Sequence, residues 1–217
     1  MGTLYVVATP IGNLEDITIR AIQVLLTVSI IACEDTRRTG QLIKILEEKY
    51  SRLLNITGQI NPKYISVRDW NEAGQVGKVL EMLQMSDLAL VSDAGTPLIS
   101  DPGYKVVRAA KESGFKVVPI PGASAVTAAL SVSGLPTNKF LFLGYLSKKW
   151  DIPEETTTII YESPKRISKT LTEIKIRYPG AKIVVAREIT KVFEYIGPDD
   201  GKTSRGEVTV LVYVPKE

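Results

Sequence analysis

Histidine is absent from the 217 residues of this chain, and its absence is the first constraint on function. Histidine is the side chain that most often acts as a general base or metal ligand near neutral pH, so Ser-His-Asp hydrolases and histidine-ligated metal enzymes are excluded. Cys33 is the only cysteine, which excludes a disulfide framework and a zinc site built from cysteines. Proton transfer must therefore depend on carboxylates, lysine, tyrosine or the substrate itself.

Long apolar runs and a strong net charge are also missing. No apolar run approaches the roughly 20 residues of a membrane helix, and the first residues lack the zones of a signal peptide. Together with the single cysteine, this predicts a cytoplasmic protein without membrane association. The net charge is +3, and the positive excess lies after residue 138. That excess is too small to indicate nucleic-acid binding, but it makes the C-terminal part the better place for a phosphate backbone.

What the chain does contain is an alternation of apolar strand-like runs and amphipathic helices. In the first part we predict strands at 4–8, 29–33, 88–92 and 115–120, and helices at 16–25, 42–46, 76–83, 101–110 and 125–131. This alternation predicts βαβ units and a parallel sheet. After a loop-like stretch at 133–138 we predict strands at 139–143, 157–161, 182–186 and 208–214, with one helix at 164–178. The second part should hold a mixed sheet, so we predict an α/β fold with domains 1–136 and 137–217.

Polar and glycine-containing clusters follow the predicted strands of the first part. They are TPIGN at 9–13, EDTRR at 34–38, DAGTP at 93–97 and PGAS at 121–124. Parallel sheets bind ligands beyond the carboxyl ends of their strands. We therefore expect a ligand site at one edge of the sheet, formed by Gly12, Glu34, Asp35, Asp93, Gly95, Thr96, Gly122 and Ser124.

Each cluster could instead have only a structural role, and the residues alone do not decide between that role and a ligand site. The cluster at 9–13 can be a simple turn, and the cluster at 121–124 can be a helix start. Asp35 can be a helix cap. The stretch 91–103 is too long and stiff for a simple connection, and it lacks the phosphate-binding and dinucleotide fingerprints. Asp101 followed by Pro102 predicts a helix cap and a first helical residue. We expect the tryptophans, Trp70 and Trp150, to be partly buried packing residues.

Several blocks carry a resemblance to a known family. They include LYVVATPIGNLEDITI at 4–19, ACEDTRRTG at 32–40, LVSDAGTPLISDPG at 90–103, YESPKR at 161–166 and AREITK at 186–191. In these blocks, which run in order over nearly the whole chain, the sequence resembles the ribosomal RNA small subunit methyltransferase I family of the tetrapyrrole-methylase superfamily. The resemblance implies two αβα domains of the class III methyltransferase type, with S-adenosyl-L-methionine (SAM) in the cleft between them. It also implies a homodimer, no metal, and methyl transfer to the 2′-oxygen of a cytidine in the 16S RNA of the small ribosomal subunit.

The resemblance extends to individual positions. It places cofactor contacts at Ile11, Gly12, Asp93, Gly95, Thr96, Ile99, Ser124, Ala125, Tyr161, Ala186, Val208 and Thr209. The acids that could orient the 2′-oxygen or accept its proton are Glu34, Asp35 and Glu72. The cations that could contact RNA phosphates are Arg37, Arg166, Arg187 and Lys191.

The chain departs from the family pattern in places, and two other functions stay open. Family members carry a histidine-containing segment before Asn71-Glu72, where this chain reads VRDW at 67–70. The segment 148–156 and the stretch after Glu194 are short. One alternative is a methyltransferase of the same fold that acts on a tetrapyrrole, a protein side chain or another small substrate. The other is a non-catalytic, ribosome-associated protein that binds SAM. The EDTR and YESPKR blocks match the RNA-directed family better than the corrin enzymes.

Overall fold

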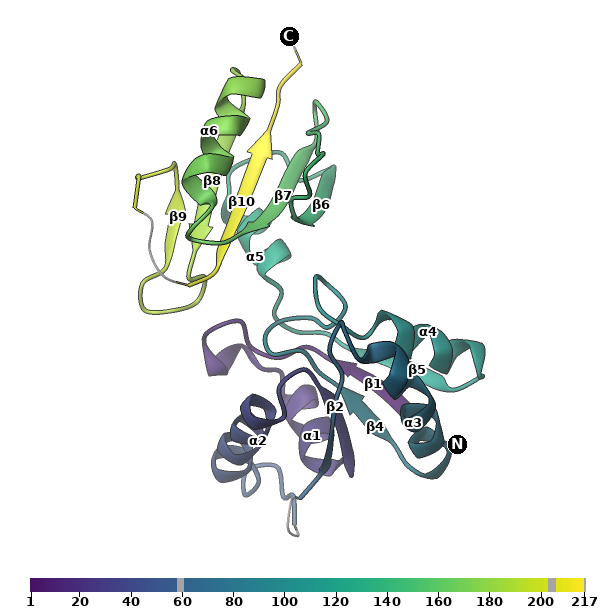
Figure 1. Ribbon diagram of the computed structural model, residues 1–217. Coiled ribbons are helices and arrows are strands. Elements are labelled where there is room, and N and C mark those ends of the chain that lie inside the picture. Colours follow the sequence, from purple (N-terminus) through teal and green to yellow (C-terminus); the bar gives the residue numbers. More distant parts are fainter. Residues whose placement is uncertain (58–60, 203–205, 217) are drawn as a thin grey trace. The chain divides into compact units, whose positions relative to one another are not determined.

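The computed structural model describes residues 1–57, 61–202 and 206–216, and the chain divides into two units, Met1–Ala123 and Ser124–Glu217 (Figure 1). The division lies before the expected boundary after residue 136. The reason is helix α5 (Ala125–Val132), which buries Val126, Ala129 and Leu130 against strands of the second unit. Helix α5 therefore belongs to the second unit.

The first unit is built on a five-stranded sheet in which every pair of neighbouring strands is parallel, as predicted. The strand order is β3-β2-β4-β1-β5. The strands are β1 (Thr3–Val7), β2 (Ile30–Cys33), β3 (Lys63–Ser66), β4 (Leu88–Leu90) and β5 (Lys116–Ile120). Strand β3 lies in a region, 55–69, whose sequence has no clear period.

Helices cover both faces of this sheet. α1 (Ile19–Thr27) and α2 (Thr36–Tyr50) lie on one face, and α3 (Glu72–Met85) and α4 (Tyr104–Glu112) lie on the other (Figure 1). Side chains alternate between the two cores, so that Val7 packs with α1 and α2 while Leu4 packs with α3 and α4. A sheet buried on both faces needs apolar residues at successive positions, which explains its continuous apolar strands.

The helix starts show where local sequence signals succeed and where they fail. A short 3-10 helix η1 (Leu14–Asp16) precedes α1, whose cap is Thr18, and α2 is capped by Asp35. The predicted Asp101 cap is wrong. Helix α4 begins at Tyr104, and its cap residue is Gly103, with a φ of +128°. A glycine has no side chain that could bond to the start of the helix.

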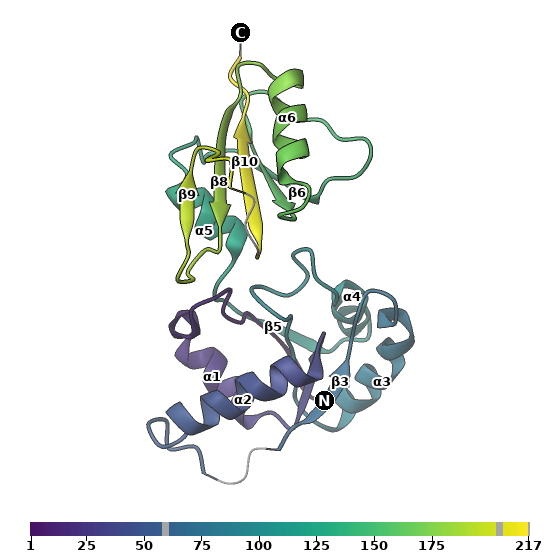
Figure 2. The same cartoon turned by 60° about the vertical axis from the view of Figure 1, so that its left-hand side comes forward.

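The second unit contains a mixed five-stranded sheet, which confirms the prediction. Its order is β6-β7-β10-β8-β9, and only β6 and β7 are parallel. The strands are β6 (Phe140–Tyr145), β7 (Thr157–Glu162), β8 (Lys182–Arg187), β9 (Tyr195–Gly197) and β10 (Val208–Tyr213). Figure 2 shows α5 and α6 (Ile167–Arg177) on opposite faces of this sheet. Strand β9 falls outside the predicted strands.

Replacement of two glycines by alanine should change the free energy of unfolding in opposite directions. Gly77 is an exposed residue inside α3, and an added Cβ would meet nothing within 4 Å. Gly77→Ala should raise the free energy of unfolding by about 0.5–1 kcal/mol, because alanine loses less chain entropy in a helix. Gly103→Ala should lower it, since its Cβ would lie 2.9 Å from Leu90 Cδ2 at a φ of +128°. Urea denaturation measures both, and equal shifts of the same sign would contradict this account.

Candidate functional site

The loops after β1, β4 and β5 are joined into one framework at the carboxyl edge of the first sheet. Thr9 and Gly95 exchange backbone hydrogen bonds, with N···O distances of 2.8 Å and 3.0 Å. Thr96 Oγ1 donates to the carbonyl oxygen of Ala123 at 3.1 Å. The polar clusters of these loops therefore share one edge, as predicted.

The backbone of this framework is tightly constrained. Gly95 has a φ of +80°, and a Cβ on Gly122 would lie 2.9 Å from the Cβ of Ala8. Leu98 and Ser100 also adopt the left-handed region, with φ values of +73° and +64°. Non-glycine residues rarely adopt this region, and such strained positions concentrate at functional sites. The loop after β4 is thus held in a shape that costs free energy.

Asp35 and Asp93 link the loop after β2 to the loop after β4. Asp93 Oδ1 accepts from the backbone N–H of Asp35 at 3.0 Å, and its Oδ2 lies 3.2 Å from Arg38 Nη1. Asp35 Oδ1 in turn accepts from the backbone N–H of Arg37 at 2.8 Å. That hydrogen bond holds the pKa of Asp35 below its usual range. A carboxylate with a lowered pKa is a weak base, so Asp35 suits capping better than proton acceptance.

Glu72, one of the three acids expected to act in catalysis, makes a structural contact in the first unit. Its side chain is buried, and Oε1 accepts hydrogen bonds from the backbone N–H groups of Gly103, Lys105 and Val106 at 3.1, 2.6 and 3.3 Å. These are the otherwise unpaired donors at the start of α4. Glu72 therefore caps α4 from the start of α3, and this oxygen is already engaged.

Glu34 and Asp101 are the two acids with raised pKa values at this edge. Burial raises the pKa of Glu34, and the nearby carboxylates Asp93 and Asp69 add to the shift. Burial likewise raises the pKa of Asp101 to about 6, with further contributions from Glu34, Asp93 and Asp69 and an opposing hydrogen bond to Ser92. Sequence reasoning missed Asp101 because its position before Pro102 is typical of a helix cap. The sequence feature that could have drawn attention to Asp101 is its position within the stretch 91–103, which is too long and stiff for a simple connection.

Three of the six expected cofactor residues of the second unit form one row on its sheet. Thr209 on β10 pairs in register with Tyr161 on β7 and with Ala186 on β8. Tyr161 and Ala186 pack on the face covered by α5, the helix that begins with Ala125 after Ser124. The side chain of Val208 instead lies in the core on the α6 face.

Two of the four expected RNA-contacting cations are exposed. The side chain of Arg37 is 87% exposed at the start of α2. Arg166 is half exposed, although its Nε donates to Glu162 Oε1 at 2.8 Å. Both guanidinium groups can therefore reach an anion in solvent.

The other two cations are committed to pairs within the second unit. Arg187 is buried, and its Nη2 lies 2.6 Å from Asp200 Oδ2. Lys191 Nζ lies 3.0 Å from Glu188 Oε1 and 2.9 Å from Glu207 Oε2. These contacts disfavour the expected phosphate-binding roles of Arg187 and Lys191.

Comparison of the sequence with known proteins identifies the family of this chain. The family model of tetrapyrrole (corrin/porphyrin) methylases matches residues 3–201. The chain belongs to the tetrapyrrole methylase family. A relative named ribosomal RNA small subunit methyltransferase I, from Neisseria meningitidis serogroup B, is 42% identical over 98% of this chain and 76% of its own length. A relative of the same name from Synechocystis sp. is 46% identical over 89% of this chain and 69% of its own.

Solved structures of other proteins share the fold. Uroporphyrin-III-C-methyltransferase from Thermus thermophilus superposes with a TM-score of 0.67 and 17% identity, covering 98% of this chain and 94% of that one. Diphthine synthase superposes with a TM-score of 0.66 and 14% identity, covering 98% and 90% of the two chains. This likeness confirms the predicted two-domain methylase fold and carries no information on the substrate.

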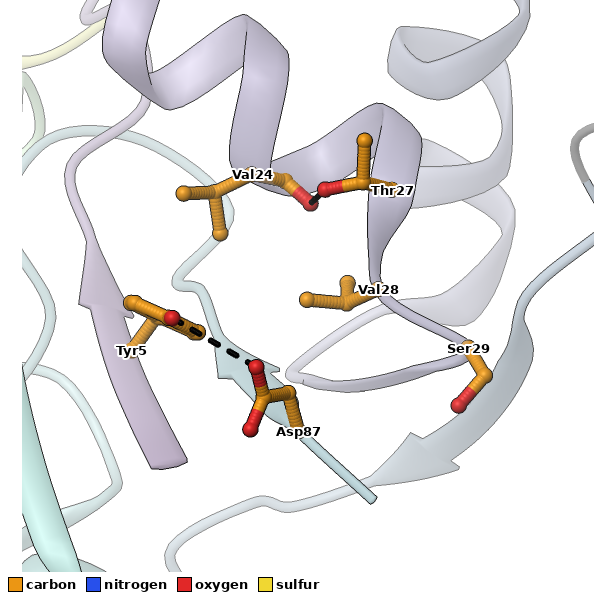
Figure 3. A pocket seen from close by; sticks show the side chains of 6 residues that line it. All are labelled: Tyr5, Val24, Thr27, Val28, Ser29 and Asp87. Carbon is orange, nitrogen blue, oxygen red and sulfur yellow. Dashed lines mark hydrogen bonds between the residues drawn. The ribbon is translucent and has the colours of Figure 1, made fainter. Parts of the chain in front are cut away.

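A surface pocket lies at the opposite edge of the methylase's first sheet (Figure 3). It is lined by Tyr5, Val24, Thr27, Val28, Ser29 and Asp87. Asp87 directly precedes β4, and its carboxylate accepts from the Thr3 N–H at 2.6 Å and from the Tyr5 hydroxyl at 3.4 Å. Because Asp87 is already paired within the fold and lies at the amino ends of the strands, we assign this pocket no function.

The described residues of the methylase contain neither a candidate metal cluster nor a helix that could span a membrane. Across 1–57, 61–202 and 206–216, no group of three or more acids and cysteines is placed to hold a metal ion. Among the helices of those same ranges, none has the length and apolarity to cross a membrane.

The cap on α4 predicts a specific stability effect. Glu72→Ala should lower the free energy of unfolding by about 1–3 kcal/mol, because it leaves buried backbone N–H groups without an acceptor. Glu72→Gln keeps a side-chain oxygen in place and should cost less. Urea denaturation of both variants measures the difference. A Glu72→Ala protein as stable as the parent would rule out the cap.

Proposed function

We propose that the protein transfers a methyl group from SAM to the 2′-oxygen of a cytidine ribose in the RNA of the small ribosomal subunit. The main support is the identity to the two relatives named above, which extends over both units of this chain. The blocks that match the RNA-directed relatives include EDTRR at 34–38, which lies at the carboxyl edge of the first sheet.

The loops of the first unit suit SAM because they present main chain rather than bulky side chains. Gly95, at a φ of +80°, lets the backbone approach Ile11 closely, because a Cβ there would lie only 3.2 Å from Ile11 Cγ2. Thr96 and the exposed Ile99 follow on the same strained loop. When bound, SAM supplies a methyl group on a sulfonium sulfur, which is electrophilic without a metal. The carboxylates at this edge are complementary to that positive charge.

Of the acids at this edge, Glu34 and Asp101 are the ones we assign to the ribose hydroxyl. Asp35 and Glu72 already serve as helix caps. A proton acceptor works best when its pKa lies close to the operating pH, and both Glu34 and Asp101 have raised pKa values. One of them would orient the 2′-oxygen toward the methyl group, and one would hold the departing proton.

Phosphate contacts in this proposal come first from Arg37, the exposed cation at the start of α2, and second from Arg166. Tyr161, Ala186 and Thr209 form the proposed cofactor contacts of the second unit. We also propose that the protein is a cytoplasmic homodimer. Sedimentation of the purified chain tests the dimer.

The deciding experiment uses unmethylated small ribosomal subunits and SAM with a labelled methyl group. We expect label in the RNA, recovered after nuclease digestion as 2′-O-methylcytidine. Label absent from RNA would contradict the proposal. Both alternatives bind SAM, so the acceptor of the label separates them: label in a tetrapyrrole or protein would favour the methyltransferase with another substrate. SAM binding in calorimetry without transfer to any acceptor would favour the non-catalytic protein.

The two assigned acids give a second prediction. Glu34→Gln and Asp101→Asn should each slow methylation, and the variant that lacks the proton acceptor should lose about 100-fold or more. Below pH 6 the Asp101 carboxyl gains a proton, so the parent rate should fall with acidification through about pH 6, and Asp101→Asn should flatten that fall. Asp35→Asn is the matched control, since asparagine also caps helices. Full rates in both acid variants would exclude carboxylate catalysis at this edge.

A further inference from the structure

Trp70 is 80% exposed, which contradicts the expectation that it is a partly buried packing residue. It lies in a tight turn in which the Asn71 N–H donates to the Arg68 carbonyl at 3.0 Å. Asn71 Oδ1 accepts from the backbone N–H of Arg68 at 2.7 Å, which closes the turn a second time. The turn is thus fixed by its own hydrogen bonds, and it holds a large aromatic side chain in water.

The turn is anchored to the carboxyl edge of the first sheet. Arg68 Nε donates to the Glu34 carbonyl at 3.0 Å, and Asn71 Nδ2 donates to the Ser66 carbonyl at 3.2 Å. The turn that carries Trp70 is therefore attached through Arg68 to the segment of Glu34 and through Asn71 to the end of β3. Its position relative to this edge is set by hydrogen bonds rather than by chance.

A second exposed aromatic residue begins the neighbouring helix. Tyr104 is 62% exposed and lies between Gly103 and Lys105, whose N–H groups both donate to Glu72 Oε1. Glu72 itself follows Trp70 by two positions. The cap therefore ties together two helix starts, and each carries an aromatic ring in solvent.

The charge of this edge indicates which part of a nucleic acid could lie there. Four carboxylates, Glu34, Asp69, Asp93 and Asp101, are close enough to influence one another. They repel phosphate groups, but they can accept hydrogen bonds from ribose hydroxyls and base amino groups. Aromatic rings stack on any unpaired base, whatever its sequence. The edge is therefore suited to the sugar and base of a nucleotide, with phosphates directed toward exposed cations such as Arg37.

We propose that Trp70 stacks on an unpaired base of the RNA substrate beside the carboxyl edge of the first sheet. This inference depends on the proposed RNA substrate. Tyr104 offers a second ring for the same strand. Trp70 is a binding residue in this proposal and takes no part in proton transfer.

The two tryptophans of the chain make a direct optical test available. Trp150→Phe leaves Trp70 as the only tryptophan, and Trp70→Phe leaves Trp150, whose ring is half-buried beneath the Arg177 guanidinium at 4.1 Å. Each protein is titrated with RNA isolated from unmethylated small subunits, while filter binding measures complex formation. Trp70 emission should be quenched as complex forms, and Trp150 emission should not change.

Affinity measurements give the complementary readout. Trp70→Ala should weaken RNA binding by roughly 5- to 150-fold, the range for loss of one base stack, and Trp70→Phe should restore most of it. SAM affinity in calorimetry should stay unchanged, and circular dichroism should show a folded chain because the side chain is exposed. RNA binding without quenching of Trp70 would overturn this inference and leave the proposed function intact. No RNA binding by the parent protein would overturn both. A Trp70→Ala chain with a changed sedimentation rate and unchanged RNA affinity would instead indicate contact with a second copy.

Discussion

The hydrogen bonds between the Glu72 carboxylate and the start of α4 are the interaction on which the rest of the first unit depends. One oxygen accepts from three backbone N–H groups, so a buried charge is compensated and a helix start is satisfied at once. Because α4 takes its cap from another helix, Asp101 is released from that role and lies among other acids. The long loop after β4 can then end at Gly103 with an unusual backbone and no loss of helix α4.

The second unit uses a related device. Glu162, at the end of β7, is buried and accepts from the Ser163 N–H at 2.7 Å, from Arg166 Nε at 2.8 Å and from Thr170 Oγ1 at 2.7 Å. These contacts hold the turn that leads into α6. In both units a buried glutamate organises the path into a helix, so a charged residue near a strand end is as much part of the scaffold as of a site.

Much of the fold follows from local sequence, and much of the site does not. The apolar runs and helical periods locate the helices and most strands, because packing on both faces of a sheet demands that pattern. Strands β3 and β9 lie at sheet edges and are only partly buried, so they lack the continuous apolar run that identifies β2 and β4, which are equally short. The prediction of Asp101 as the cap of α4 was wrong, because the cap is supplied by Glu72 from 31 positions away and leaves no local signal. The exposure of Trp70 likewise depends on the turn that Asn71 closes.

The strand order β3-β2-β4-β1-β5 also constrains how the chain can assemble during its synthesis. Strand β1 pairs with β4 and β5 and not with β2, the next strand to be made. Strand β1 therefore has no pairing partner on either side until residues 88–120 have left the ribosome. The nascent first unit exposes apolar strands during that interval. The central strand of the finished sheet is β4, so it must insert between β2 and β1, whereas β5, the last strand to be made, is added at the edge beside β1. Translation rate and chaperone access over this interval thus become determinants of the yield of folded enzyme.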